Sequence, residues 1–295
     1  MKLLHLFFLL CSTACLSQEN KIFERLTALN NDGTKWYNID GYTVTSEYFT
    51  YPFDEKGLKK VFKKYRIAKS DLKVKDGDIP FNNFCISKKQ KVTDKSVQTD
   101  NYYFVENLNK TITVIWFIKN GTTDRETELE LLNAIIKAEV PEQNFVSMPA
   151  TTLNFTGREI NLDSRCYWTY INTVQCPYLG EMNWSIHRTL ADAKESVENQ
   201  LSLTKTRKNG KVISEELVDI EFEGVPTKAK KVMYDFTGIS AAIVGMTGGK
   251  NLTIYYVAEV VNSKNISCVL SFWNNAVINP ETNLTPLLEQ YMVLK

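Results

Sequence analysis

The sequence predicts an α+β fold built from two similar domains, each a curved antiparallel sheet packed with helices. Runs of β-branched and aromatic residues between turn residues, for instance 41–51 and 112–118, predict strands. Apolar residues at helical spacing, as in 58–65, predict helices that pack on those strands. The motif Glu-Thr-x-Leu-x-x-Leu follows a strand and a turn twice, from Glu126 and from Glu281, which favours an internal duplication.

The first seventeen residues have the pattern of a secretory signal peptide. Lys2 supplies one positive charge, residues 3–14 carry no formal charge and are rich in Leu and Phe, and small residues precede Gln18. The apolar core is about a dozen residues long, whereas a membrane-spanning helix needs about 20. We therefore expect a secreted or periplasmic protein without a transmembrane segment.

The cleavage point has an alternative that involves Cys15. The sequence Ser12-Thr13-Ala14-Cys15 is similar to a bacterial lipoprotein box, although such a box usually carries a Leu-like residue in place of Ser12. Cleavage there predicts a protein that is lipid-anchored through Cys15.

Four cysteines follow the signal region, which suits an oxidising compartment. Cys166 and Cys176 flank a run of strand-forming residues with Asn172 near its middle, and a hairpin there brings both ends together. We therefore predict a disulfide between Cys166 and Cys176. Cys85 and Cys268 are expected to be buried free thiols or a second bridge.

The chain divides into four segments on this interpretation. These are a signal peptide (1–17), a helical lead-in and linker (18–40), a first α+β domain (41–147) and a second α+β domain (148–295). Helices are expected over about 58–65, 126–138, 190–203 and 280–292, where Asn279 caps the last one. Strands or hairpins are expected over 41–51, 81–87, 102–118, 153–162, 166–176, 212–222, 227–236, 252–261 and 265–272.

The stretch 184–295 resembles the PsbP-like (Mog-type) fold. It combines a helix of mixed charge, the strand Val212-Ile-Ser-Glu-Glu216, the turn Phe222-Glu-Gly-Val-Pro226, paired strands and a final helix. The resemblance implies a curved antiparallel sheet with helices packed on it, and proteins that are mostly non-enzymatic binding or accessory proteins. Because a fold does not determine a function, the resemblance only favours binding over catalysis.

The sequence contains no catalytic, metal or cofactor motif. His187 is the one histidine after the signal region, and it lies in neither a zinc motif nor a G-x-S-x-G context; we expect it at the surface or at a helix entry. Asp219, Glu221 and Glu223 alternate along a predicted strand, which is typical of a solvated sheet face. The net charge of +1 gives no general attraction to nucleic acid.

The segment 56–75 is strongly basic. An apolar stripe that includes Leu58 and Val61 is expected to pack on the sheet, so that the lysines of the same helix face outward. That face suits contact with an anionic surface such as lipid headgroups or acidic glycans, or it serves only to keep the helix solvated. The residues predicted for this contact are Lys59, Lys60, Lys63 and Lys64.

The tryptophans allow two interpretations. The five are Trp36, Trp116, Trp168, Trp184 and Trp273. They are candidates for stacking on sugars, but the positions of Trp116 and Trp273 at strand ends favour core packing.

These observations favour an exported, non-enzymatic binding or accessory protein whose partner is an unknown protein or an anionic surface. One alternative is a secreted hydrolase with a carboxylate-based site in a cleft between the domains. Another is a lipid-anchored accessory protein of the cell envelope.

Overall fold

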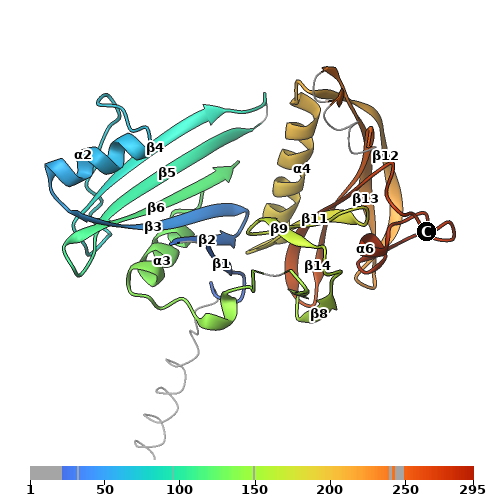
Figure 1. Ribbon diagram of the computed structural model, residues 1–295, viewed down its shortest axis with the longest axis horizontal. Coiled ribbons are helices and arrows are strands. Elements are labelled where there is room, and N and C mark those ends of the chain that lie inside the picture. Colours follow the sequence, from blue (N-terminus) through green and yellow to red (C-terminus); the bar gives the residue numbers. More distant parts are fainter. Residues whose placement is uncertain (1–21, 32, 95, 149, 239–240, 243–248) are drawn as a thin grey trace, which may run out of the picture.

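The computed structural model describes residues 22–295 apart from 32, 95, 149, 239–240 and 243–248. Two large antiparallel sheets lie side by side in this part of the chain, and helix α4 (Leu190–Thr206) stands where they meet (Figure 1). The predicted signal peptide and Cys15 lie outside the described residues. Among the helices that are described, none has both the length and the apolar character needed to cross a membrane.

The N-terminal sheet has six antiparallel strands in the order β1-β2-β3-β6-β5-β4. Its central strand β6 buries Ile112 and Val114 in one apolar cluster, and Ile115 and Phe117 in another. Apolar side chains therefore occupy both faces, as expected for a strand covered on its two sides. The strands are β1 (Thr27–Asn31), β2 (Thr34–Ile39), β3 (Tyr42–Pro52), β4 (Asn83–Lys91), β5 (Val97–Glu106) and β6 (Thr111–Asn120).

Two capped helices cover the two faces of this sheet. Helix α2 (Glu55–Lys64) begins after Asp54, whose carboxylate accepts a hydrogen bond from the Gly57 amide at 2.7 Å. Helix α3 (Arg125–Ile136) begins after Asp124, which accepts from the Glu126 amide at 2.9 Å. Because α2 is only 10 residues long, it covers one end of its face and leaves the rest of that face open.

The C-terminal sheet has eight antiparallel strands in the order β16-β12-β13-β14-β15-β11-β10-β9. Its longest pair is the hairpin of β12 and β13, in which Phe222 lies opposite Val225 around a tight turn. The strands are β9 (Tyr167–Tyr170), β10 (Thr173–Cys176), β11 (Gly180–His187), β12 (Gly210–Phe222), β13 (Val225–Phe236), β14 (Asn251–Val261), β15 (Lys264–Trp273) and β16 (Met292–Leu294).

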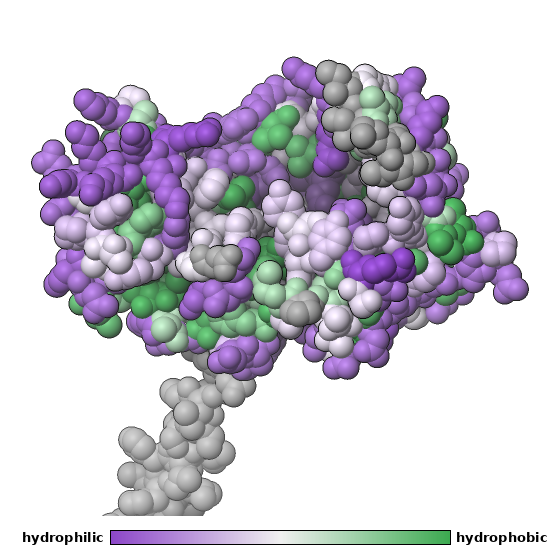
Figure 2. Space-filling model, viewed as in Figure 1, coloured by the Kyte–Doolittle hydropathy of each residue, from purple (hydrophilic) through white to green (hydrophobic). Residues whose placement is uncertain are grey.

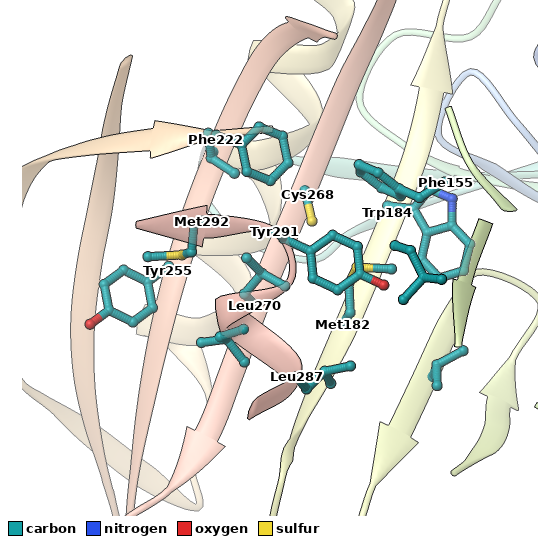
Figure 3. Packing of buried hydrophobic residues seen from close by; sticks show 14 of the residues in the cluster. Phe155, Met182, Trp184, Phe222, Tyr255, Cys268, Leu270, Leu287, Tyr291 and Met292 are labelled. Atoms are coloured by element: carbon teal, nitrogen blue, oxygen red, sulfur yellow. The ribbon is translucent and has the colours of Figure 1, made fainter. Parts of the chain in front are cut away.

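One face of the C-terminal sheet carries the largest apolar core. The short hairpin β7 (Thr152–Phe155) and β8 (Arg158–Asn161) and the helix α6 (Pro286–Glu289) pack there. The ring of Phe155 meets the rings of Tyr291 and Trp184 edge-on, with centroids 5.1 and 6.2 Å apart (Figure 3). The short 3-10 helix η1 (Glu142–Asn144) lies on the connection between the two sheets.

Helix α4 packs on the opposite face of the C-terminal sheet. It begins after Thr189, whose side chain accepts a hydrogen bond from the Asp192 amide. Val197 and Leu201 are buried against Val232, Ile254 and Tyr256. The helix contacts β14, β15 and β11, so it crosses the middle of the sheet rather than its edge.

The two sheets are joined by direct hydrogen bonds. The Asp40 amide donates to the Ile186 carbonyl at 3.0 Å, and the Gly41 amide donates to the Ser185 hydroxyl at 3.0 Å. Gly41 has a φ of +76°, and a Cβ there would lie 3.1 Å from Cε1 of the His187 ring. A side chain at this turn is therefore opposed both by backbone conformation and by the neighbouring ring.

The predicted α+β class is wrong, because the described chain is mainly β. Its sixteen strands form three antiparallel sheets, whereas the helices are few and cover only parts of the two large sheets. Most neighbouring strands follow one another in the sequence as antiparallel hairpins, as in β12–β13 and β14–β15. The prediction overestimated the share of the short helices in the fold and underestimated that of the long strands between them.

Two individual elements also differ from expectation. The described part of 18–40 contains strands β1 and β2 instead of a helical lead-in, with Thr27 opposite Asn38. The helix expected over 280–292 is reduced to α6, because Asn283 takes a positive φ of 58° and Thr285 is extended. The repeated motif is therefore helical from Glu126 but lies in a turn at Glu281.

Candidate functional site

A groove of about 900 Å³ lies on the open part of the α2 face of the N-terminal sheet. Strand register places the residues of its floor side by side. Trp36 lies opposite Thr45, Thr45 lies opposite Trp116, and Trp116 lies opposite Tyr102. These residues form one row across β2, β3, β6 and β5, and we call the site the aromatic groove. Its lining consists of Thr34, Trp36, Thr45, Glu47, Lys64, Tyr65, Arg66, Lys88, Lys89, Gln90, Asp100, Tyr102 and Trp116.

The aromatic floor is held in place by ring contacts. The Tyr102 and Trp116 rings stack with centroids 5.1 Å apart and planes 17° from parallel. Tyr65, just after α2, meets both rings edge-on at 6.0 and 6.3 Å. Burial raises the pKa of Tyr102 to about 12, so its phenol stays neutral at physiological pH. Trp36 is half-buried and joins no ring contact among the described residues.

Two carboxylates lie in the groove, and both are already hydrogen-bonded. Asp100 is buried and accepts from Nε1 of Trp116 at 3.2 Å and from Gln98 at 3.1 Å. Glu47 accepts from the Tyr65 hydroxyl at 2.9 Å and forms an ion pair with Lys64. Because every one of these partners is a donor, both side chains act as carboxylate acceptors.

The groove has an excess of positive charge. Four basic side chains line it (Lys64, Arg66, Lys88 and Lys89), against the two carboxylates. Lys88 forms an ion pair with Asp71 at 2.7 Å and lies over the Tyr102 ring at 6.0 Å. Hydrogen bonding to Lys88 lowers the pKa of the Asp71 carboxyl. Lys89 is exposed and makes no ion pair with the described residues.

The predicted basic helix face borders this groove. Lys59, Lys60, Lys63 and Lys64 are all exposed on α2, while Leu58 and Val61 are buried as expected. Hydrophilic residues predominate at the end of the molecule that carries α2 (Figure 2). Of the four lysines only Lys64 lines the groove, and contact of this face with an anionic surface stays a prediction.

The predicted disulfide is confirmed. Cys166 and Cys176 are bonded, with Cα atoms 4.2 Å apart, and they join the ends of the β9–β10 hairpin. Cys85 and Cys268 are free thiols. Burial raises the pKa of both thiols, to about 11 at Cys85, which disfavours the reactive thiolate.

The other side chains singled out in the sequence do not converge on a catalytic centre. His187, expected at the surface or at a helix entry, lies at the end of β11 just before α4 and is buried, where its Nε2 lies 2.8 Å from the Ser267 hydroxyl. Asp219, Glu221 and Glu223 form ion pairs with Lys228, Lys295 and Arg158, respectively. Within the described residues no three His, Cys, Asp or Glu side chains are grouped to hold a metal ion.

Sequence reasoning missed the groove because its residues are far apart along the chain. Trp36 lies within the predicted lead-in, and Trp116 was assigned to core packing. Trp116 does pack on the cluster around Phe104, but it is half-buried and its other side lines the groove. Only the strand register reveals that both indoles lie in one row.

Comparisons with known proteins leave the family open. No family model matches the chain, and no curated protein is significantly similar to it. One solved structure with weak similarity is the di-domain ARO/CYC StfQ from the steffimycin biosynthetic pathway, at 9% identity and a TM-score of 0.17, covering 90% of this chain and 79% of that one. Another is DynU16, from the dynemicin biosynthetic locus, at 7% identity and a TM-score of 0.18, covering 90% and 82%.

Proposed function

We propose that this chain is an exported, non-enzymatic binding protein that holds an acidic glycan in the aromatic groove. The observation that carries the proposal is the row of Trp36, Trp116 and Tyr102 beside basic side chains. The half-buried indoles of Trp36 and Trp116 offer flat apolar faces that suit pyranose rings, and the buried Tyr102 ring supports Trp116 by stacking on it. Asp100 on the floor is an acceptor for hydroxyl groups. The cations of the groove suit carboxylate or sulfate groups. The buried Cys166–Cys176 disulfide supports export to an oxidising compartment.

The aromatic groove gives little support to a hydrolase, and it lies on the N-terminal sheet alone rather than in the cleft between the domains where a carboxylate-based site was predicted. A glycosidase needs one carboxyl group that carries a proton and a second one that acts as base or nucleophile. Here Glu47 is paired with Lys64, and Asp100 accepts from Trp116 and Gln98, so neither group is placed as a proton donor. This arrangement favours binding without bond cleavage.

Titration calorimetry with tetragalacturonate, and with maltotetraose as the neutral counterpart, tests the proposal. We expect tetragalacturonate to bind more tightly, and its binding to weaken as salt rises because exposed charges are screened. The variant Trp36→Ala is expected to weaken binding about fivefold, through loss of one stacking face worth about 1 kcal/mol. Trp36 lies outside the described apolar clusters, so this variant should keep the fold.

Two matched variants make the result decisive. Lys89→Gln should reduce affinity and flatten the salt dependence, whereas Lys137→Gln, an exposed lysine at the end of α3, should change neither. Equal affinity for both oligosaccharides, or unchanged binding in Trp36→Ala, would overturn the proposal. Loss of binding only in Lys59→Gln/Lys63→Gln would instead move the contact onto the outer face of α2.

A further inference from the structure

A second cavity, of about 590 Å³, lies beneath α4 and shares no described residue with the aromatic groove. Its floor is the α4 face of the C-terminal sheet, and α4 forms its roof with Asn199, Gln200 and Arg207. The N-terminal sheet closes one side with Asn38 and Thr43. We call it the α4 cavity. Its volume lies in the range of about 300–1,000 Å³ that is usual for small-molecule sites.

Hydroxyl and amide side chains dominate the floor of the α4 cavity. Strand register places Glu181 opposite Ser271, and Asn183 opposite both Thr173 and Val269. The Asn183 amide donates to the Thr173 hydroxyl at 2.7 Å, which fixes its orientation. Groups of this kind both donate and accept hydrogen bonds, so they match a ligand rich in hydroxyl groups.

Glu181 is the one carboxylate among the described residues that line the cavity. It is half-buried on β11, and its carboxylate accepts no hydrogen bond from the described side chains. Burial raises its pKa, while the charge of Arg207 at the end of α4 opposes that change. A half-buried carboxylate without a hydrogen-bonded cation gains from a ligand that brings a positive charge.

The entrance to the cavity adds an aromatic surface. Tyr170, at the turn between β9 and β10, lines the cavity and is 63% exposed. Asn172 beside it is anchored, because its amide donates to the Trp184 carbonyl at 2.9 Å. An exposed phenol ring can cover one face of a sugar ring or of a cation.

We propose that the α4 cavity binds a small hydroxyl-rich molecule that carries one ammonium group, as an amino sugar does. The ammonium group pairs with the Glu181 carboxylate, and the hydroxyl groups exchange hydrogen bonds with Asn183, Ser271 and Gln200. This site is independent of the aromatic groove, whose excess charge is positive and which selects anions. The described cavity lining holds one carboxylate, Glu181, and one cation, Arg207, so it lacks the positive excess of the groove. The two sites lie on neighbouring surfaces, because Thr43 of the cavity and Thr45 of the groove are two residues apart on β3.

Saturation-transfer NMR and calorimetry with glucosamine, and with glucose as the uncharged counterpart, test this inference on the full mature chain. We expect glucosamine to bind about tenfold more tightly than glucose, as a charge-assisted hydrogen bond allows. In Glu181→Gln, which has nearly the same shape, this preference should disappear. In Asn183→Ala both sugars should bind more weakly.

A groove variant separates the two sites. Trp36→Ala should leave glucosamine binding unchanged, whether or not tetragalacturonate binds the groove. Gln200→Trp, which places a large ring in the cavity from α4, should abolish glucosamine binding. Equal affinities for glucosamine and glucose, or a preference that persists in Glu181→Gln, would overturn the inference.

Discussion

At the scale of single residues, Glu128 on α3 is a buried carboxylate that requires several hydrogen-bond donors. It is 1% exposed and accepts from the hydroxyls of Tyr42 at 3.0 Å and Tyr103 at 2.6 Å, and from the Asn101 amide at 2.9 Å. These donors come from β3 and β5, so one carboxylate joins α3 to two strands. Buried polar groups of this kind stabilise a fold only while every partner is present.

We therefore predict that Glu128→Ala destabilises the protein by about 3 kcal/mol, because it leaves several buried donors without an acceptor. Urea unfolding followed by tryptophan fluorescence measures this loss. Glu128→Gln should cost less, since its amide oxygen still accepts. Glu139→Ala, at an exposed position just after the same helix, should be nearly neutral. A similar loss in both alanine variants would show that the network contributes nothing specific.

At the scale of elements, the β9–β10 hairpin depends on its disulfide. The hairpin forms the edge of the C-terminal sheet, and Tyr170 and Asn172 of the α4 cavity lie at its turn. Cys166 and Cys176 are separated by 10 residues, and closing a loop of that size stabilises by about 2–3 kcal/mol in the chain-entropy model. The bond therefore fixes both a sheet edge and part of the wall of the α4 cavity.

The double variant Cys166→Ser/Cys176→Ser is predicted to unfold about 2–3 kcal/mol more easily than the native protein. Chemical unfolding with and without a reducing agent measures the difference. The reducing agent should weaken the native protein but have no effect on the double variant, because Cys85 and Cys268 are free. Equal stability of the native and reduced proteins would contradict this role.

Elements with a strong local pattern were predictable from the sequence, and those set by distant partners were not. Strand β3 and helices α3 and α4 were expected close to their observed bounds, because spacing and caps determine them locally. The chain from Met292 becomes strand β16 because β12 offers it a free edge, which no local pattern shows. The groove is likewise a product of register, since Trp36 and Trp116 meet only across β3.

At the scale of the whole molecule, the two sheets are held together by a largely polar interface. Arg188 forms ion pairs with Asp124 at 3.2 Å and Glu126 at 2.9 Å, and the Asn199 amide donates to the Asn120 carbonyl at 3.3 Å. The α4 cavity opens within this interface, so a ligand there touches both sheets. Ligand binding and the docking of the two sheets are therefore expected to support each other.

We expect His187 to make this junction sensitive to acid. Its ring is 2% exposed beside Gly41, and the charged groups near it include Asp40, Lys119, Asp192, Glu195 and Arg25. Burial lowers its pKa from 6.5 to about 4, so the folded protein holds the neutral ring. The unfolded chain takes up a proton first as the pH falls below about 6.5. The neutral ring therefore makes its full contribution to the free energy of unfolding above about pH 6.5. This contribution is lost progressively as the pH falls towards 4.

We predict that the native protein loses about 3 kcal/mol of stability between pH 7 and pH 4 through this residue, and that His187→Gln loses correspondingly less. Unfolding free energies of both proteins, measured by urea titration at half-unit pH steps, give the difference. The pKa of Asp124 is lowered below 3.8 by hydrogen bonds and by Arg188 against the effect of burial, so its contribution is lost only in stronger acid. Stability curves that stay parallel between pH 7 and pH 4.5 would show that His187 does not set the acid sensitivity of the junction.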